Sequence, residues 1–103
     1  MGLYTLAKSR AKRFGVPFTI TIDDVRAVYP VDGKCPVLGI DLQRGREGKV
    51  LENSPTLDRL NNQWGYEPGN IAVISYRANR AKGGLTATEL EQIALWMRAR
   101  GLE

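Results

Sequence analysis

Two oxygen-bearing side chains in the middle of the chain have the chemistry of cation ligands. Asp58 ends one apolar segment, and Asn79 follows the next one. Carboxylate and amide oxygens are the ligands that hard cations such as Mg²⁺ and Mn²⁺ prefer, and Mg²⁺ needs few of them because water and phosphate oxygens complete its coordination. The pair therefore predicts a site for Mg²⁺ or Mn²⁺, provided that the fold brings the two side chains together.

Cationic side chains flank both positions. Arg59 directly follows Asp58, and further cations surround Asn79. Guanidinium and ammonium groups suit phosphate oxygens, so the cluster indicates a phosphodiester ligand beside the cation. Taken alone, an Asp-Arg pair is more often a structural ion pair, and Asn79 would be a solvated helix residue. The cations around Asn79 are Arg77, Arg80 and Lys82.

The apolar segments predict the elements that position these residues. "PTLDRL" is typical of a short strand, and the β-branched run Ile71–Ser75 predicts a buried strand. Ser75 can cap a short helix that continues to Lys82 and stops at the glycines after it. Residues 61–70 between the strands predict an ordered loop, in which we expect Trp64 and Tyr66 to pack rather than to stack on bases.

The N-terminal segment predicts a basic amphipathic helix. "LYTLAKSRAKRF" has apolar points at Leu3, Leu6 and Phe14 and no acidic residue. A cationic cluster without acids favours phosphate contacts, although a plain solvated helix face is the alternative. A second short helix is expected after Thr21. The cations of the first helix are Lys8, Arg10, Lys12 and Arg13.

The C-terminal segment "TATELEQIALWMRARG" predicts a helix. Thr86 and Glu89 have capping-box spacing. Apolar residues then recur at helical spacing, and we expect Trp96 to lie in the core beside them. The residues of this apolar face are Leu90, Ile93, Ala94 and Met97.

Composition limits the remaining interpretations. The 103 residues suit one domain, and 15 Lys and Arg against 11 Asp and Glu give a net charge of +4, which suits DNA but also an ordinary solvated surface. The single Cys35 excludes an internal disulfide, and no apolar run reaches membrane length, so we expect a cytoplasmic protein without a membrane partner. The chain contains no histidine. Mechanisms in which histidine is the base, the nucleophile or a metal ligand are therefore excluded.

Two stretches together resemble a known family. "CPVLGI" and "SPTLDRLNNQWGYEPGNIAVISYRANRAK" are similar to the ββα-metal core of HNH (His-Me finger) endonucleases, and especially to small phage-encoded members. The resemblance implies an α+β fold, a small HNH-like core with flanking helices, and the host cytoplasm as the location of a phage-encoded protein. It divides a single domain, 1–103, into a basic helical part (1–34), the core (35–82) and a C-terminal helix (85–101).

The resemblance also implies roles for single residues. Asp58 matches the metal-binding carboxylate, and Asn79 matches the helix residue that completes the metal site. Asn70 matches the asparagine that braces the loop, and Lys82 the basic residue that follows on the helix. Cys35 matches the first cysteine of a knuckle that binds zinc in some relatives.

Arg59 departs from the family pattern, because it stands where the family has its catalytic histidine. A guanidinium stays protonated at neutral pH and cannot accept a proton from water. It could instead contact the scissile phosphate. Tyr66, Tyr76 or a metal-bound water would then have to accept the proton.

The knuckle is a second departure. Zinc needs about four ligands, which one cysteine and no histidine cannot supply. We therefore expect no structural zinc. The turn would instead be held by packing of Val37, Leu38 and Ile40.

The favoured function is metal-dependent hydrolysis of DNA phosphodiester bonds, with Asp58, Arg59 and Asn70 as the catalytic residues. The alternative is an inactive scaffold that binds DNA or inhibits a host protein. The missing histidine favours this alternative, whereas the retained Asp58 and Asn79 oppose it. A third alternative is a structural module or homodimer built around the last helix.

Overall fold

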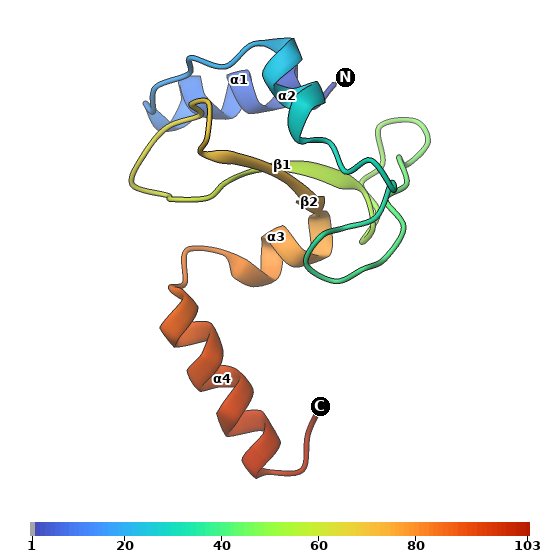
Figure 1. Cartoon of the computed structure of the whole chain (residues 1–103), viewed down its shortest axis with the longest axis vertical. Helices are drawn as coiled ribbons and strands as arrows, with labels where there is room; N and C mark the ends of the chain where they lie inside the picture. The colour runs from blue at the N-terminus through green and yellow to red at the C-terminus, as the bar shows by residue number, and fades with distance from the viewer. Residues whose placement is uncertain (1) are drawn as a thin grey trace.

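The computed structural model describes residues 2–103 and has an α+β fold, as predicted. Figure 1 shows a small central sheet with α1 and α2 on one side, α3 on the other, and α4 extending away from them. The described chain extends over 44 × 30 × 24 Å. Its elements are α1 (Leu3–Phe14), α2 (Ile22–Val28), β1 (Pro55–Arg59), β2 (Ile71–Ser75), α3 (Tyr76–Lys82) and α4 (Ala87–Ala99).

The sheet consists of β1 and β2, paired antiparallel with Leu57 opposite Val73 and Arg59 opposite Ile71. Because side chains alternate along a strand, the two faces of the sheet have different neighbours. Leu57 and Val73 belong to the main core with the buried residues of α1 and α2. Thr56 and Asp58 lie on the other face, and both contact α3.

The side of α1 that packs on the sheet differs from the predicted one. Leu3, Ala7 and Ala11 are buried, whereas Leu6 is 45% and Phe14 is 59% exposed. Positions 3, 7 and 11 follow one another at the spacing of four that aligns side chains on one helix face. The two alanines let the helix backbone approach the sheet closely, so the expectation was wrong for Leu6 and Phe14.

The segment after α2 forms the predicted tight turn, but packing does not hold it as expected. Cys35 N donates to Ile40 O at 2.8 Å, and Gly39 N donates to Cys35 O at 2.8 Å. Val37 is 64% and Leu38 is 47% exposed, because both lie at the tip of the turn. Of the three expected packing residues, Ile40 alone joins the small core around Cys35.

Cys35 is a buried structural residue. Its Sγ accepts a hydrogen bond from Ser75 N at 3.3 Å, which ties the turn to the start of α3. Burial raises the pKa of the Cys35 thiol, but hydrogen bonds from Ser75 and from the backbone at residues 37 and 38 outweigh it, so the pKa lies below its ordinary value.

The packing expected for α4 is wrong. Its capping box is present, with Thr86 Oγ1 accepting from Glu89 N at 3.1 Å. None of its residues is buried, however, and Trp96 is 55% exposed. Gly83 and Gly84 separate α4 from α3, and the helix leads away from the sheet (Figure 1), so its apolar face meets no core. Within residues 2–103, no helix combines the length and apolar character needed to cross a membrane.

Candidate metal and phosphate site

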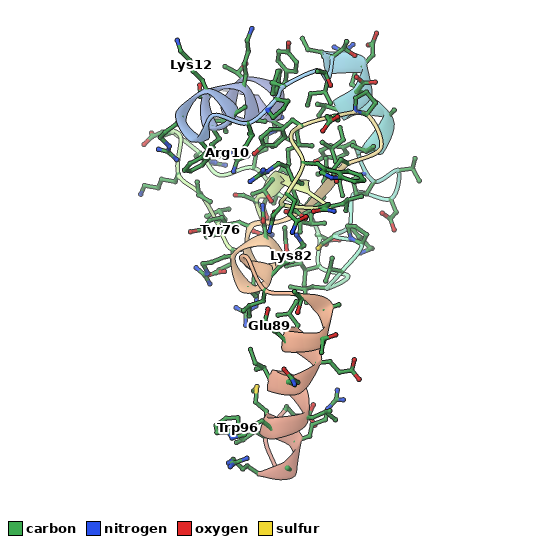
Figure 2. All side chains as sticks on the ribbon, turned by 90° about the vertical axis from the view of Figure 1, so that its left-hand side faces the viewer. Arg10, Lys12, Tyr76, Lys82, Glu89 and Trp96 are labelled. Atoms are coloured by element: carbon green, nitrogen blue, oxygen red, sulfur yellow. The ribbon has the colours of Figure 1, made fainter. Side chains whose placement is uncertain are left out.

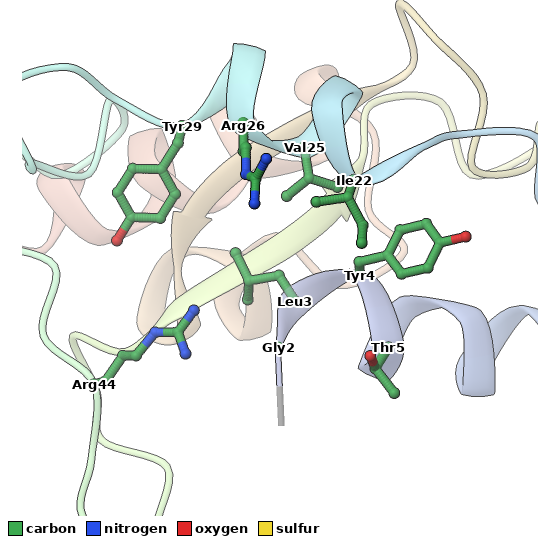
Figure 3. A pocket seen from close by; sticks show the side chains of 9 residues that line it. All are labelled: Gly2, Leu3, Tyr4, Thr5, Ile22, Val25, Arg26, Tyr29 and Arg44. Carbon is green, nitrogen blue, oxygen red and sulfur yellow. The ribbon is translucent and has the colours of Figure 1, made fainter.

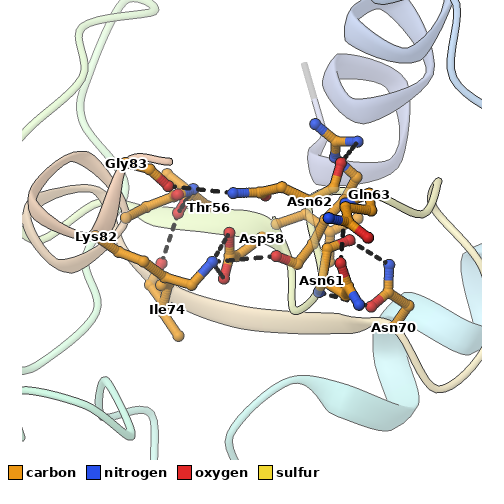
Figure 4. Close-up of polar contacts among 12 residues, drawn as sticks. Thr56, Asp58, Asn61, Asn62, Gln63, Asn70, Ile74, Lys82 and Gly83 are labelled. Carbon is orange, nitrogen blue, oxygen red and sulfur yellow. Dashed lines mark hydrogen bonds and ion pairs between the residues drawn. The ribbon is translucent and has the colours of Figure 1, made fainter. Parts of the chain in front are cut away.

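Asp58 and Lys82 form the centre of the candidate site. Asp58 is 6% exposed, and Lys82 Nζ lies 3.1 Å from its Oδ2. Lys82 Nζ also donates to the backbone oxygen of Arg59 at 3.2 Å (Figure 4). Lys82 is the last residue of α3, so the end of the helix carries the cation that compensates a buried carboxylate.

Asn79 lies on α3 almost one turn before Lys82 and faces the same strand. Its Nδ2 donates to Thr56 Oγ1 at 3.1 Å, and the Thr56 hydroxyl donates to Ile74 O at 2.8 Å. Thr56 and Asp58 share one face of β1, so the two contacts run side by side. Thr56 was not predicted from the sequence. It lies two residues before Asp58 on a strand, and this spacing, which puts both side chains on one face, could have identified it. Asn79 thus holds β1 through its amide nitrogen, and its oxygen is the atom that would ligate a cation.

Asn70 braces the loop between the strands. Its Oδ1 accepts from Asn61 N at 2.8 Å, and its Nδ2 donates to Asn61 O at 3.2 Å and to Gly65 O at 2.8 Å. The side chain is 4% exposed, so these contacts are shielded from water. Gly69 has φ +85°, a left-handed conformation that suits the turn into Asn70. Asn70 thus makes the backbone contacts expected of a brace, and its part in catalysis stays a prediction.

The loop also packs on the segment after α1. Tyr66 N donates to Pro17 O at 2.9 Å, and a Cβ on Gly65 would lie 2.2 Å from the same oxygen. Only glycine fits so close an approach. Tyr66 is 5% exposed, which confirms that it packs under the loop.

Arg59 takes the place under the loop that was expected for Trp64. Its Nη1 donates to Asn62 O at 3.1 Å and to Trp64 O at 2.9 Å, and its guanidinium lies 5.6 Å from the Tyr66 ring centre. Trp64 is consequently 60% exposed, so the expectation of packing was wrong for this side chain. Arg59 follows Asp58 on the strand and turns to the other face, where it supports the loop.

The cations of α1 divide between two sides of the helix. Arg10 and Arg13 line a groove of about 440 Å³ together with Thr56 and Tyr76, and Thr56 is the residue of this groove that contacts Asn79. Arg10 Nη2 donates to Leu57 O at 3.4 Å and is thereby fixed to β1. Figure 2 shows Arg10 directed toward the sheet and Lys12 directed away from it. The two lysines, Lys8 and Lys12, border a separate groove beside Val16 and Phe18.

The two arginines of α3 are also unequal. Arg77 is exposed, whereas Arg80 Nη2 contacts both carboxylate oxygens of Glu52 at 2.9 and 3.0 Å. The hydrogen bond to Glu52 raises the pKa of Arg80 further above its ordinary value. Arg80 would have to leave Glu52 before it could contact DNA with that nitrogen, so Arg77 is the better placed of the two.

A further cavity of about 340 Å³ lies between α1 and α2 (Figure 3). Leu3 and Val25 contribute to its apolar wall, and Arg26, Tyr29 and Arg44 to its margin. The buried residues of α1 and α2 cover the face of the sheet opposite to Asp58. This cavity is therefore separate from the candidate site.

Comparison with known proteins identifies the fold. The chain matches no protein-family profile and no curated protein. Among solved structures it is similar to the rare-cutting HNH restriction endonuclease PacI, with a TM-score of 0.65 and 22% identity over 98% of this chain and 80% of that one. The fold is an HNH-like ββα core. At this identity the likeness establishes the fold and leaves the activity to be argued from the site.

The donor set at Asp58 fits a hard cation with few protein ligands. Within residues 2–103, no group of three or more His, Cys, Asp or Glu side chains could hold a metal. The candidate ligands are one carboxylate and one amide oxygen, which suits Mg²⁺ or Mn²⁺ completed by water and phosphate oxygens. Lys82 lies at the Asp58 carboxylate, so cation binding requires the ammonium group to move.

Proposed function

We propose that this protein hydrolyses DNA phosphodiester bonds with the help of Mg²⁺ or Mn²⁺ held by Asp58 and Asn79. The observation that carries the proposal is a carboxylate only 6% exposed on the first strand of an HNH-like core, facing the helix that bears Asn79 and Lys82. The similarity to a DNA-cutting HNH enzyme supports the same reaction class. A phage origin and a host-cytoplasmic location belong to the proposal through the sequence resemblance.

Each residue of the site has a defined task in this proposal. A bound divalent cation would neutralise charge on the scissile phosphate and lower the pKa of a coordinated water. Lys82, released from Asp58, would donate to a phosphate oxygen of the DNA backbone. Asn70 keeps the loop in one conformation through its three backbone contacts. Arg59 supports the same loop from the other face of β1, so its guanidinium would have to leave the loop to contact the phosphate.

The proton of the attacking water needs an acceptor among the chain's own residues or the solvent. Tyr66 is 5% exposed beneath Arg59, which separates it from a bound substrate. Tyr76 is half-buried and lines the groove that also contains Thr56. Of the two tyrosines, Tyr76 is the better candidate for the base.

The DNA backbone would run along the groove beside α1. Arg10 and Arg13 line it, and exposed Arg77 lies on the adjoining helix. Lys8 and Lys12, on the other side of α1, would add long-range attraction rather than contacts at the site. Arg80 and Lys82 would join the contacts after leaving their carboxylate partners.

A second function is favoured by one specific observation. Lys82 already pairs with Asp58, and Arg59 is committed to the loop, so both charged groups have partners within the chain. A protein of this kind could bind DNA, or block a host protein, without cutting. The two functions differ in whether Asp58 is needed for a chemical step.

A plasmid-nicking assay with Mg²⁺, Mn²⁺ or EDTA distinguishes them. We expect cutting with either cation, none in EDTA and none by Asp58→Ala. Asp41→Ala is the matched control, because Asp41 also pairs with a lysine, Lys34, but is largely exposed, with a side chain 78% accessible. Cutting by Asp58→Ala at the wild-type rate would refute the proposal. A protein that binds the plasmid in a gel-shift assay but does not cut it under any of these conditions would be the inactive scaffold.

A further inference from the structure

α4 is a helix whose apolar side chains lack a partner within the described chain. None of its residues is buried, and Ile93 is 47%, Leu95 59% and Trp96 55% exposed. A helix of this length is marginal in water unless one face packs against something. Figure 2 shows Trp96 standing out from α4 far from the sheet. We therefore expect another molecule to cover the exposed apolar side chains of α4.

Ile93 and Trp96 belong to one stripe of the helix, whereas Leu95 lies on another side. Leu85, Ile93 and Trp96 line a shallow groove together with Glu89 and Gln92. Arg100 belongs to the same side, because its guanidinium lies 4.2 Å from the Trp96 ring centre and its Nη1 donates to Trp96 O at 3.1 Å. The stripe thus has an acid at its beginning, apolar residues in its middle and a base at its end.

We propose that α4 packs antiparallel against α4 of a second copy of this chain. In an antiparallel pair related by a two-fold axis, Glu89 would face Arg100 of the partner subunit, twice in each dimer. The register that places Glu89 opposite Arg100 of the partner subunit also places Ile93 opposite Trp96 of the partner subunit. A single arrangement therefore satisfies both the charges and the apolar side chains.

The charge of α4 disfavours DNA as the occupant. Glu89 and Glu91 balance Arg98 and Arg100, whereas the whole chain carries +4. A surface that covers a polyanion needs an excess of cations. A second copy of the same helix needs self-complementary charges, which is the pattern found. The proposal stands independently of whether the protein cuts DNA.

The oligomeric state as a function of concentration tests this proposal. We expect light scattering after gel filtration to show a dimer that dissociates on dilution, and Ile93→Asp to be monomeric at every concentration. Ile93 lies outside both core clusters, so circular dichroism of this variant should show the wild-type helix content of the rest of the chain. A monomeric wild-type protein at all concentrations, or a dimer undiminished by Ile93→Asp, would overturn the proposal.

Two arginines of the same helix end give a matched control for the register. Arg100→Glu places an acid against Glu89 of the partner subunit at both ends of the paired helices and should raise the dimer dissociation constant about ten-fold. Arg98→Glu makes the same charge change on the other side of the helix and should leave that constant within about two-fold of wild type. Equal weakening by both variants would contradict the antiparallel register. Hydrogen exchange that protects α4 only when duplex DNA is added would identify DNA as the occupant and also refute the proposal.

Discussion

α3 and α4 are both helices that begin after a hydroxyl side chain, yet only α3 is part of the core. Ser75 Oγ accepts from Ala78 N at 3.1 Å, and Thr86 Oγ1 accepts from Glu89 N at 3.1 Å, so both helices have a side-chain N-cap, and α4 has the reciprocal bond of a capping box in addition. Ser75 is also the last residue of β2, which forces α3 to begin against the sheet. α4 begins after two glycines that release it from that constraint. A cap therefore determines where a helix starts, and the connection before it determines what the helix packs against.

The largest difference between the helices should appear when a charge is placed on each. Ala78 is 6% exposed and packs with Cys35 and Ile74, so Ala78→Asp should lower the free energy of unfolding by about 3 kcal/mol or more. Ala94 on α4 is only half-buried, and Ala94→Asp should cost less than about 1 kcal/mol in dilute protein. Urea unfolding followed by circular dichroism measures both. Similar losses would show that α4 belongs to the same cooperative unit.

Removing the two N-terminal caps should also affect α3 more than α4, with smaller changes in the free energy of unfolding. Ser75→Ala should lower the free energy of unfolding by about 1–2 kcal/mol, because the buried Ala78 N–H loses its acceptor. Thr86→Ala should fray α4 while the main transition moves by less than about 0.5 kcal/mol. Hydrogen exchange at single amides separates local fraying from global unfolding. A global loss in Thr86→Ala equal to that in Ser75→Ala would contradict the distinction.

The smallest expected effects concern the two exposed tryptophans. Trp64 stands on the loop that Arg59 and Asn70 fix, whereas Trp96 lies on α4. Stacking of a base on Trp64 would make Trp64→Ala bind single-stranded DNA about 5- to 10-fold more weakly. Trp96→Ala should bind the same DNA as wild type does, since α4 carries no excess of cations. Fluorescence anisotropy with a labelled oligonucleotide measures both affinities, and equal losses would remove Trp64 from the DNA surface.

Local sequence signals predicted the elements of this fold well. The β-branched run at Ile71–Ser75, the hydroxyl caps and the glycine stops correspond to the observed strands and helices. The brace made by Asn70 and the burial of Tyr66 were also predicted. These features depend on residues near one another in the chain, or on a motif whose parts fold together.

The features that failed depend on contacts between distant segments. Trp64 was expected to pack, but Arg59 occupies that space beside Tyr66. Trp96 has the same apolar character as a core residue, and only the direction of α4 exposes it. The pairing of Lys82 with Asp58 arises because α3 folds back across β1, so the residue predicted to bind phosphate is the partner of the predicted metal ligand. Residue type and spacing alone do not determine which of two partners a charged group meets.

Binding of Mn²⁺ measured by calorimetry tests the central claim most directly, because it does not depend on catalysis. We expect the wild-type protein to bind one Mn²⁺ and Asp58→Ala to bind none. Lys82→Met removes the competing ammonium group from a carboxylate whose side chain is only 8% exposed, so it should bind Mn²⁺ more tightly than wild type and gain more thermal stability from it. Binding by Asp58→Ala that equals wild type, or weaker binding by Lys82→Met, would contradict a cation site at Asp58.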